Sequence, residues 1–192
     1  MKSNLVTFAL TALLGLTVTA TLTASCSSPA TSARVDALGP ARAQFDVVVP
    51  MLVRRCGSID CHGSNYRNMR VYGYGGTRLR DAGAPASSVL RPDFPANITA
   101  DEVEATYQAV VGLEPEIMRE VVLAGGAGPE RLTLVRKGRD EERHKGHLRI
   151  TPGDTADRCL LTWLASSVDV AACNAAGCVG DGGLIEGEGC AQ

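Results

Sequence analysis

Cys56, Cys61 and His62 lie in one short stretch, with four residues between the cysteines and the histidine directly after the second. Thiols and an imidazole at this spacing suit three kinds of site: a disulfide across a short turn, a zinc centre, or covalent attachment of haem c. In the third case each thiol adds to a haem vinyl group, and the adjacent imidazole becomes the proximal iron ligand. These residues are therefore the first candidate site.

The three interpretations differ in how well they suit this spacing. Zinc usually takes four ligands at paired spacings, which this stretch does not provide. The direct Cys-His step favours haem, because a proximal imidazole must lie beside the porphyrin edge that the second thioether holds. The usual haem motif has two residues between the cysteines, whereas the wider gap is familiar from multihaem cytochromes of sulfate reducers. The motif alone leaves haem attachment and a disulfide turn open.

Residues 1–25 predict export. An apolar, uncharged run over 5–22 and the small residues after it are typical of a secretory signal peptide. Residues 22–26 are similar to the lipobox of bacterial lipoproteins, which predicts lipidation of Cys26 and leaves an even number of the 7 cysteines to pair. We expect an outer-membrane lipoprotein facing the periplasm or cell surface, with 26–40 as its lipid-anchored tether. A soluble secreted form and an uncleaved anchor are the alternatives.

Composition narrows the function classes. The 192-residue chain has a formal net charge of -2 with both signs scattered, so no feature indicates nucleic-acid binding. Aromatic residues are only 4% of the chain, so few large side chains are available to fill its core. A large apolar cofactor would stabilise this core, and small residues with disulfides are the alternative. No nucleophile triad, carboxylate pair or phosphate loop stands out, which favours an electron carrier or binding module over an enzyme.

Helical periodicity predicts a mostly α fold. Apolar residues recur at helical spacing from Phe45 to Leu52, on a helix that leads to Cys56 and is kinked or restarted at Pro50. The other predicted elements are a long loop over 63–95, a helix from the capping box at Thr99 to Gly112, a helix from Pro115 to Gly125, a short extended piece over 132–136, and a helix that begins at Asp154 or Thr155 and buries Trp163.

Several of these segments together resemble one family. They are Phe45 to Gly63 with its two cysteines and His-Gly, 67–70, 76–79, 132–137, 144–147, 152–154 and 159–164. The series is similar to the planctomycete-type cytochrome c-like domains, in which an apolar helix, cysteines and His-Gly precede a second histidine motif and a closing Leu-x-x-Trp helix. The resemblance covers most of residues 45–165 and implies a small cytochrome c-like helical domain over 41–168 that binds one haem c.

The resemblance also implies a role for each residue of the first motif. Cys56 and Cys61 would form the thioethers to haem, and His62 would be the proximal iron ligand. The apolar wall of the haem site would include Val48, Leu160 and Trp163.

For the distal iron ligand the resemblance favours His144, which matches the second histidine motif of the family. His147 ranks next, and Met118 or Met69 would give the His/Met pair of higher-potential cytochromes. The other interpretation of 143–149 is a solvated basic loop, since three cations lie among its two histidines.

Four cysteines remain after Cys26, Cys56 and Cys61, and four cysteines allow three pairings. We favour Cys159 with Cys173 and Cys178 with Cys190, with a structural role in an oxidising compartment. Residues 169–192 are predicted as a Cys- and Gly-rich tail that only cross-links or packing on the domain can order.

These observations together predict a lipid-anchored monohaem c-type protein that transfers electrons to a redox partner the sequence does not identify. The alternative is a haem-less, disulfide-stapled envelope lipoprotein that acts as a binding or structural module.

Overall fold

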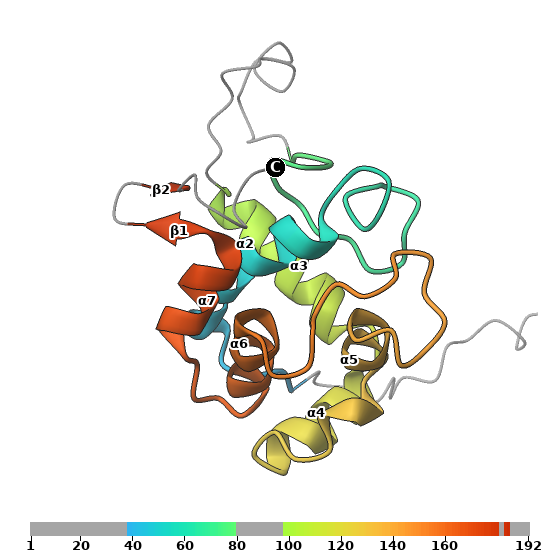
Figure 1. Cartoon of the computed structure of the whole chain (residues 1–192), viewed down its shortest axis with the longest axis vertical. Coiled ribbons are helices and arrows are strands. Elements are labelled where there is room, and N and C mark those ends of the chain that lie inside the picture. The colour runs from blue at the N-terminus through green and yellow to red at the C-terminus, as the bar shows by residue number, and fades with distance from the viewer. Residues whose placement is uncertain (1–37, 80–97, 181–182, 185–192) are drawn as a thin grey trace, which may run out of the picture. The chain divides into compact units, whose positions relative to one another are not determined.

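The computed structural model describes residues 38–79, 98–180 and 183–184 (Figure 1). The predicted signal peptide, Cys26 and most of the tether lie outside these residues. Within the described ranges, no helix combines the length and the apolar character that crossing a membrane requires.

The described chain is helical, as the sequence predicts. Its elements, with 3-10 helices labelled η, are η2 (Arg42–Gln44), α2 (Phe45–Cys56), α3 (Ala100–Val111), α4 (Pro115–Leu123), η4 (Pro129–Arg131), α5 (Thr133–Gly138), α6 (Thr155–Leu164), α7 (Val170–Gly177), β1 (Val179–Gly180) and β2 (Gly183–Leu184) (Figure 1). The two strands pair antiparallel over two residues each. All described residues fall in one compact unit.

Helix α2 is central to the core. It packs against α3, α6 and α7, and α6 also packs against α7 (Figure 1). The helix runs unbroken through Pro50 to Cys56, rather than restarting at the proline. Its crossing with α7 is close, because a Cβ added at Gly177 would lie 2.9 Å from the Cβ of Pro50. Glycine at this position therefore lets the two helices approach.

Three aromatic side chains occupy the core beside α2. The ring centroids of Phe45 and Trp163 are 5.0 Å apart, and those of Phe45 and Tyr107 are 5.4 Å apart. Phe45 and Trp163 are fully buried. The prediction that Trp163 is a core residue is confirmed, and it packs in a cluster of three of the eight aromatic residues of this chain.

Helices α3, α4 and α6 begin where the sequence predicts. Thr99 and Glu102 form a complete capping box at α3, Pro115 is the first residue of α4, and the Asp154 side chain accepts the Asp157 N–H at the start of α6. Local side-chain chemistry is enough to set these starts.

The predicted extended piece over 132–136 is wrong, because α5 occupies this segment. Both carboxylate oxygens of Glu114 cap its first turn, accepting the Thr133 N–H at 2.6 Å and the Thr133 hydroxyl at 2.8 Å. Leu134 and Gly138, one helical turn apart, are both buried. A contact from a distant part of the chain therefore decides the conformation, and two alternating leucines could not reveal it.

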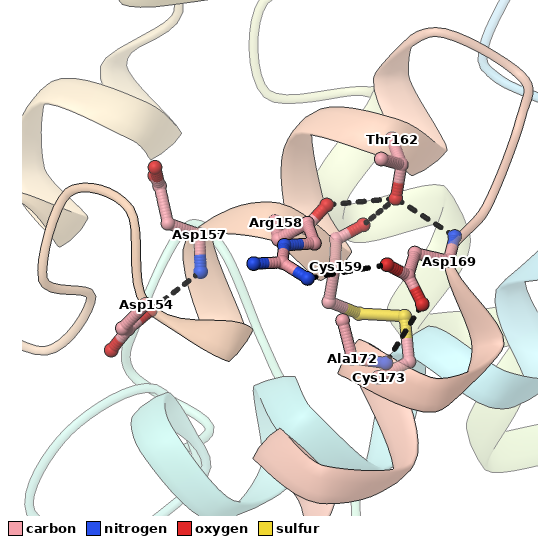
Figure 2. Close-up of a disulfide and its surroundings, with 8 residues drawn as sticks. All are labelled: Asp154, Asp157, Arg158, Cys159, Thr162, Asp169, Ala172 and Cys173. Atoms are coloured by element: carbon pink, nitrogen blue, oxygen red, sulfur yellow. Dashed lines mark hydrogen bonds and ion pairs between the residues drawn. A yellow bond between two sulfur atoms is a disulfide. The ribbon is translucent and has the colours of Figure 1, made fainter.

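Residues 170–177, in the predicted tail, form α7, a helix that the sequence does not predict. This helix packs on α2 and α6. The predicted disulfide between Cys159 and Cys173 is present and joins α6 to α7 (Figure 2). The Asp169 side chain caps α7 by accepting the Ala172 N–H.

The second predicted disulfide is only partly within the described residues. Cys178 is disulfide-bonded. Its predicted partner, Cys190, lies outside the described residues, so the pairing stays a prediction.

Candidate functional site

The candidate residues from both motifs meet at one cavity. Cys56, Cys61, His62 and His144 all line it, and its volume is about 730 Å³. Ligand and cofactor sites typically have volumes of roughly 300–1,000 Å³, so this cavity has the size of a cofactor site. Its apolar lining residues are Met69, Leu113, Leu134 and Ile150.

The predicted apolar wall is wrong in its membership. Val48, Leu160 and Trp163 are fully buried in the core and do not line the cavity. The inward side of α2 is used for helix packing, so only its last residue reaches the cavity. The apolar lining comes instead from α5, from the loop that follows α2, from the connection between α3 and α4, and from the loop that follows α5.

A compact loop places His62 next to Cys56, the last residue of α2. The His62 N–H donates to the carbonyl of Cys56 at 2.9 Å, and the N–H groups of Cys61 and Gly63 both donate to the carbonyl of Ser58 at 2.9 Å. The four residues between the cysteines are thus folded into turns. The wider gap therefore leaves the backbone of His62 directly beside that of Cys56.

Three glycines hold this loop in close backbone contact. A Cβ at Gly63 would lie 2.1 Å from the carbonyl oxygen of Gly57. A Cβ at Gly76 would lie 2.4 Å from the same oxygen and 2.5 Å from the Cα of Gly63. The atoms in the way belong to the backbone, so only glycine fits at these positions. Gly63 is also tied down by Thr77, whose N–H donates to its carbonyl at 2.7 Å.

The segment over 71–79 connects this loop to α3. The Val71 N–H donates to the carbonyl of His62 at 2.9 Å, and the Tyr72 N–H donates to Oγ1 of Thr106 at 3.0 Å. Thr106 lies on α3 and is fully buried. The position of the histidine backbone is therefore set by a helix distant in sequence.

A buried ion pair completes this connection. The carboxylate of Glu102 on α3 is fully buried and accepts Nε and Nη2 of Arg78 at 2.6 and 3.0 Å. It also accepts the N–H groups of Leu79 and Thr99, both at 3.0 Å. A buried carboxylate is tolerated only with such partners. Glu102 thus caps α3 and anchors the loop segment at once.

The ring of His62 has a defined tautomer. Its Nδ1 is 3.0 Å from the backbone carbonyl oxygen of Met69. A carbonyl oxygen can only accept, so Nδ1 carries the proton and Nε2 has a free lone pair. Burial lowers the pKa of His62 below its usual value, although the bond to Met69 opposes the shift. The ring is therefore neutral and oriented, as the rings of metal-binding histidines usually are.

His144 is the distal candidate that the structure brings to His62. Their ring centroids are 5.9 Å apart, and the ring planes are inclined by 23°. His147 has φ of 54° in a turn in which its N–H donates to the His144 carbonyl at 3.0 Å, and its side chain is exposed away from the cavity. Met118 is buried on α4 and does not line the cavity, whereas Met69 does.

The packing of His144 differs from that of His62. A Cβ at Gly146 would lie 2.8 Å from Cε1 of His144, so the ring lies directly on the backbone of this glycine. The Nδ1 atom of His144 is buried and has no hydrogen-bond partner among the described residues. The sequence alone does not predict this contact, because the packing of the His144 ring on Gly146 depends on the folded turn.

Both thiols of the first motif are free. Cys56 is buried and Cys61 is half-buried, and no disulfide joins them. Burial raises the pKa of Cys56 to about 12, so its thiol is protonated at neutral pH. Among the described residues, no three His, Cys, Asp or Glu side chains are placed to hold a metal ion together. The arrangement therefore supports neither the disulfide turn nor a zinc centre made by these side chains.

The cavity is lined by more cations than anions. The lining cations are Arg67, Lys137, Arg143, Lys145 and Arg149, and Asp60 is the lining carboxylate. Lys137 forms an ion pair with Glu142 at 3.1 Å. The side chains of Arg143, Lys145 and Arg149 are exposed and have no ion-pair partner among the described residues. The cavity therefore carries a positive charge that the chain as a whole, at -2, does not.

In comparisons with known proteins, no family model, no curated protein and no solved structure matches this chain. The resemblance described from the sequence therefore stays a prediction, and the functional argument depends on the residues of this chain.

Proposed function

We propose that this protein is a monohaem c-type electron carrier that resembles the planctomycete-type cytochrome c-like domains. The observation that carries the proposal is the convergence of Cys56, Cys61, His62 and His144 on one cavity of about 730 Å³. Two free thiols on one wall and two imidazoles 5.9 Å apart are the donor set that covalent haem with two axial histidines requires.

The residues present fit this group in further ways. The thiols of Cys56 and Cys61 would each add across one vinyl group, so that the sulfur bonds to carbon and the thiol proton moves to the neighbouring carbon. Nε2 of His62 has the free lone pair of a proximal ligand, and the Met69 carbonyl makes this nitrogen more basic by accepting the Nδ1–H. Bound haem would supply one-electron redox chemistry at its iron.

The chain would tune that chemistry through its own groups. The apolar side chains of Met69, Leu134 and Ile150 would exclude water from the cavity, and the lining cations would favour the state with more negative charge. The proposal also includes export and lipidation of Cys26, which rest on the N-terminal sequence. Electron transfer would then take place with a redox partner at the membrane surface.

The test is expression of the full chain, with its signal, in a host that has haem c maturation machinery. We expect a haem-stained band after denaturing electrophoresis and a pyridine haemochrome spectrum of a two-thioether haem. Cys61→Ser should shift that spectrum toward a single thioether, and Cys26→Ser should release the protein from the membrane fraction. The absence of covalent haem would refute the cytochrome proposal and favour the envelope-module alternative.

A further inference from the structure

We propose, building on the proposed function, that the two histidines are unequal ligands. His62 is fixed, whereas His144 is displaceable, so the protein binds a small anionic ligand at the iron position that His144 leaves. The assignment comes from the different ways in which the chain holds the two rings.

His62 is held by its ring and its backbone. The ring donates through Nδ1 to the Met69 carbonyl at 3.0 Å. The backbone N–H of His62 donates to Cys56 and its carbonyl accepts from Val71, both at 2.9 Å. The loop around it contains the buried glycines Gly57 and Gly63. Rotating this ring would break its bond to Met69, and moving the backbone that carries it would break the bonds to Cys56 and Val71 as well.

His144 has far fewer restraints. Within 143–148, the described backbone hydrogen bond is the one from the His147 N–H to the His144 carbonyl. Arg143, Lys145, His147 and Leu148 are exposed, so the segment has little apolar anchoring. The Nδ1 atom of the ring has no hydrogen-bond partner in the described part of the chain, and the ring packs on Gly146. Segments with few buried contacts and few hydrogen bonds open at the lowest free-energy cost.

The charges around the cavity decide which ligands would enter. Arg143 and Lys145 flank His144, Arg149 follows it, and none of the three has an ion-pair partner among the described residues. A cavity lined by excess cations attracts anions and raises their local concentration. We therefore assign the ligand class as small anions with a lone pair, in preference to neutral ligands of the same size.

The exchange involves no oxidation or reduction. Nε2 of His144 would leave the iron of bound haem, and a lone pair of the incoming ligand would take its place. The apparent affinity is then reduced by the fraction of molecules in which His144 is displaced. If His144 is displaced in a few per cent of molecules, removal of its side chain should tighten ligand binding roughly 10- to 100-fold.

The experiment uses the full, haem-loaded chain. Azide is titrated into the oxidised protein and carbon monoxide into the reduced protein, with the Soret spectrum as readout. We expect saturable binding of both, tightened roughly 10- to 100-fold by His144→Ala. His147→Ala is the matched control and should leave both affinities unchanged. Gly146→Ala, which crowds the His144 ring, should move both affinities toward those of His144→Ala.

The different charges of azide and carbon monoxide provide a second test. Lys145→Gln should weaken azide binding while leaving carbon monoxide binding unchanged. Wild-type protein that responds to neither ligand, while His144→Ala binds both, would overturn the proposal because His144 would then be fixed. Equal affinities in wild type and His144→Ala would overturn it too, because His144 would not be a ligand. A preparation without covalent haem would overturn both proposals, and its haemochrome spectrum identifies that case before any ligand is added.

Discussion

Gly76→Ala tests whether close backbone packing positions the loop that carries Cys61 and His62. The added methyl group would lie 2.4 Å from the carbonyl oxygen of Gly57 and 2.5 Å from the Cα of Gly63. Both atoms belong to the backbone, so neither can be relieved by a rotamer change. The neighbouring Gly75 is the matched control, because a methyl group there would have Gly57 O as its nearest neighbour, at 3.7 Å.

The expected magnitude follows from comparing the two variants. Replacing glycine with alanine stabilises by about 0.4–1 kcal/mol through the unfolded state wherever the native backbone accepts it, and this contribution is common to both variants. Overpacking costs about 1–3 kcal/mol and applies to Gly76→Ala alone. The difference in the free energy of unfolding should therefore be about 1–3 kcal/mol, or roughly 2–12 °C in Tm for a domain of this size.

Urea denaturation of the mature chain, followed by far-UV circular dichroism and by the fluorescence of Trp163, measures this difference. The chain has one Trp, and it is fully buried, so its fluorescence reports on the core. Gly76→Ala should also lower the yield of covalent haem, whereas Gly75→Ala should not. If Gly76→Ala proves as stable as Gly75→Ala, the three glycines do not pack as described, and the account of how the loop is positioned is wrong.

Three further predictions concern other parts of the fold. In cofactor-free protein at pH 8, iodoacetamide should modify Cys61 well before Cys56. Cys56 is buried, and its pKa of about 12 leaves about one molecule in 10⁴ as thiolate. Peptide mass spectrometry that finds Cys56 modified first would contradict this prediction. Glu102→Gln should lower the free energy of unfolding by about 3–5 kcal/mol, because it breaks the buried ion pair with Arg78. Glu104→Gln, at an exposed ion pair, should lower it by less than about 1 kcal/mol. Equal losses would refute the account of the buried ion pair. Gly177→Ala should cost about 1–3 kcal/mol in thermal denaturation by forcing α7 away from α2, and an unchanged Tm would argue against the close crossing.

Elements with local start signals could be predicted from the sequence. The capping box at Thr99 and the cap at Asp154 mark where α3 and α6 begin, because each signal acts within one helical turn. The disulfide between Cys159 and Cys173 could also be predicted, since it joins the predicted last helix to the segment directly after it, over a sequence separation of 14.

Elements that depend on distant contacts could not be predicted. Helix α5 needs Glu114 to cap its first turn, and no local pattern around Thr133 reveals this partner. Helix α7 is built largely of small residues, so it has no contrast between an apolar and a polar face. Its many alanines were the available signal, because alanine has the highest helix propensity.

The candidate site shows the same division. The residue types and spacing of Cys56, Cys61 and His62 indicate where a candidate site lies, but the walls of the cavity come from segments that meet only after folding. The choice of His144 over His147 depends on a turn with φ of 54° at His147, which turns the second ring away. Periodicity carries no information about such a turn.

Mass spectrometry of the purified, matured protein is the most direct test of the central claim. After denaturation and proteolysis, we predict that the peptide containing Cys56 and Cys61 carries one covalently bound haem and no free thiol. Recovery of this peptide with both thiols free, or joined to each other in a disulfide, from a host that matures other c-type cytochromes would contradict the account.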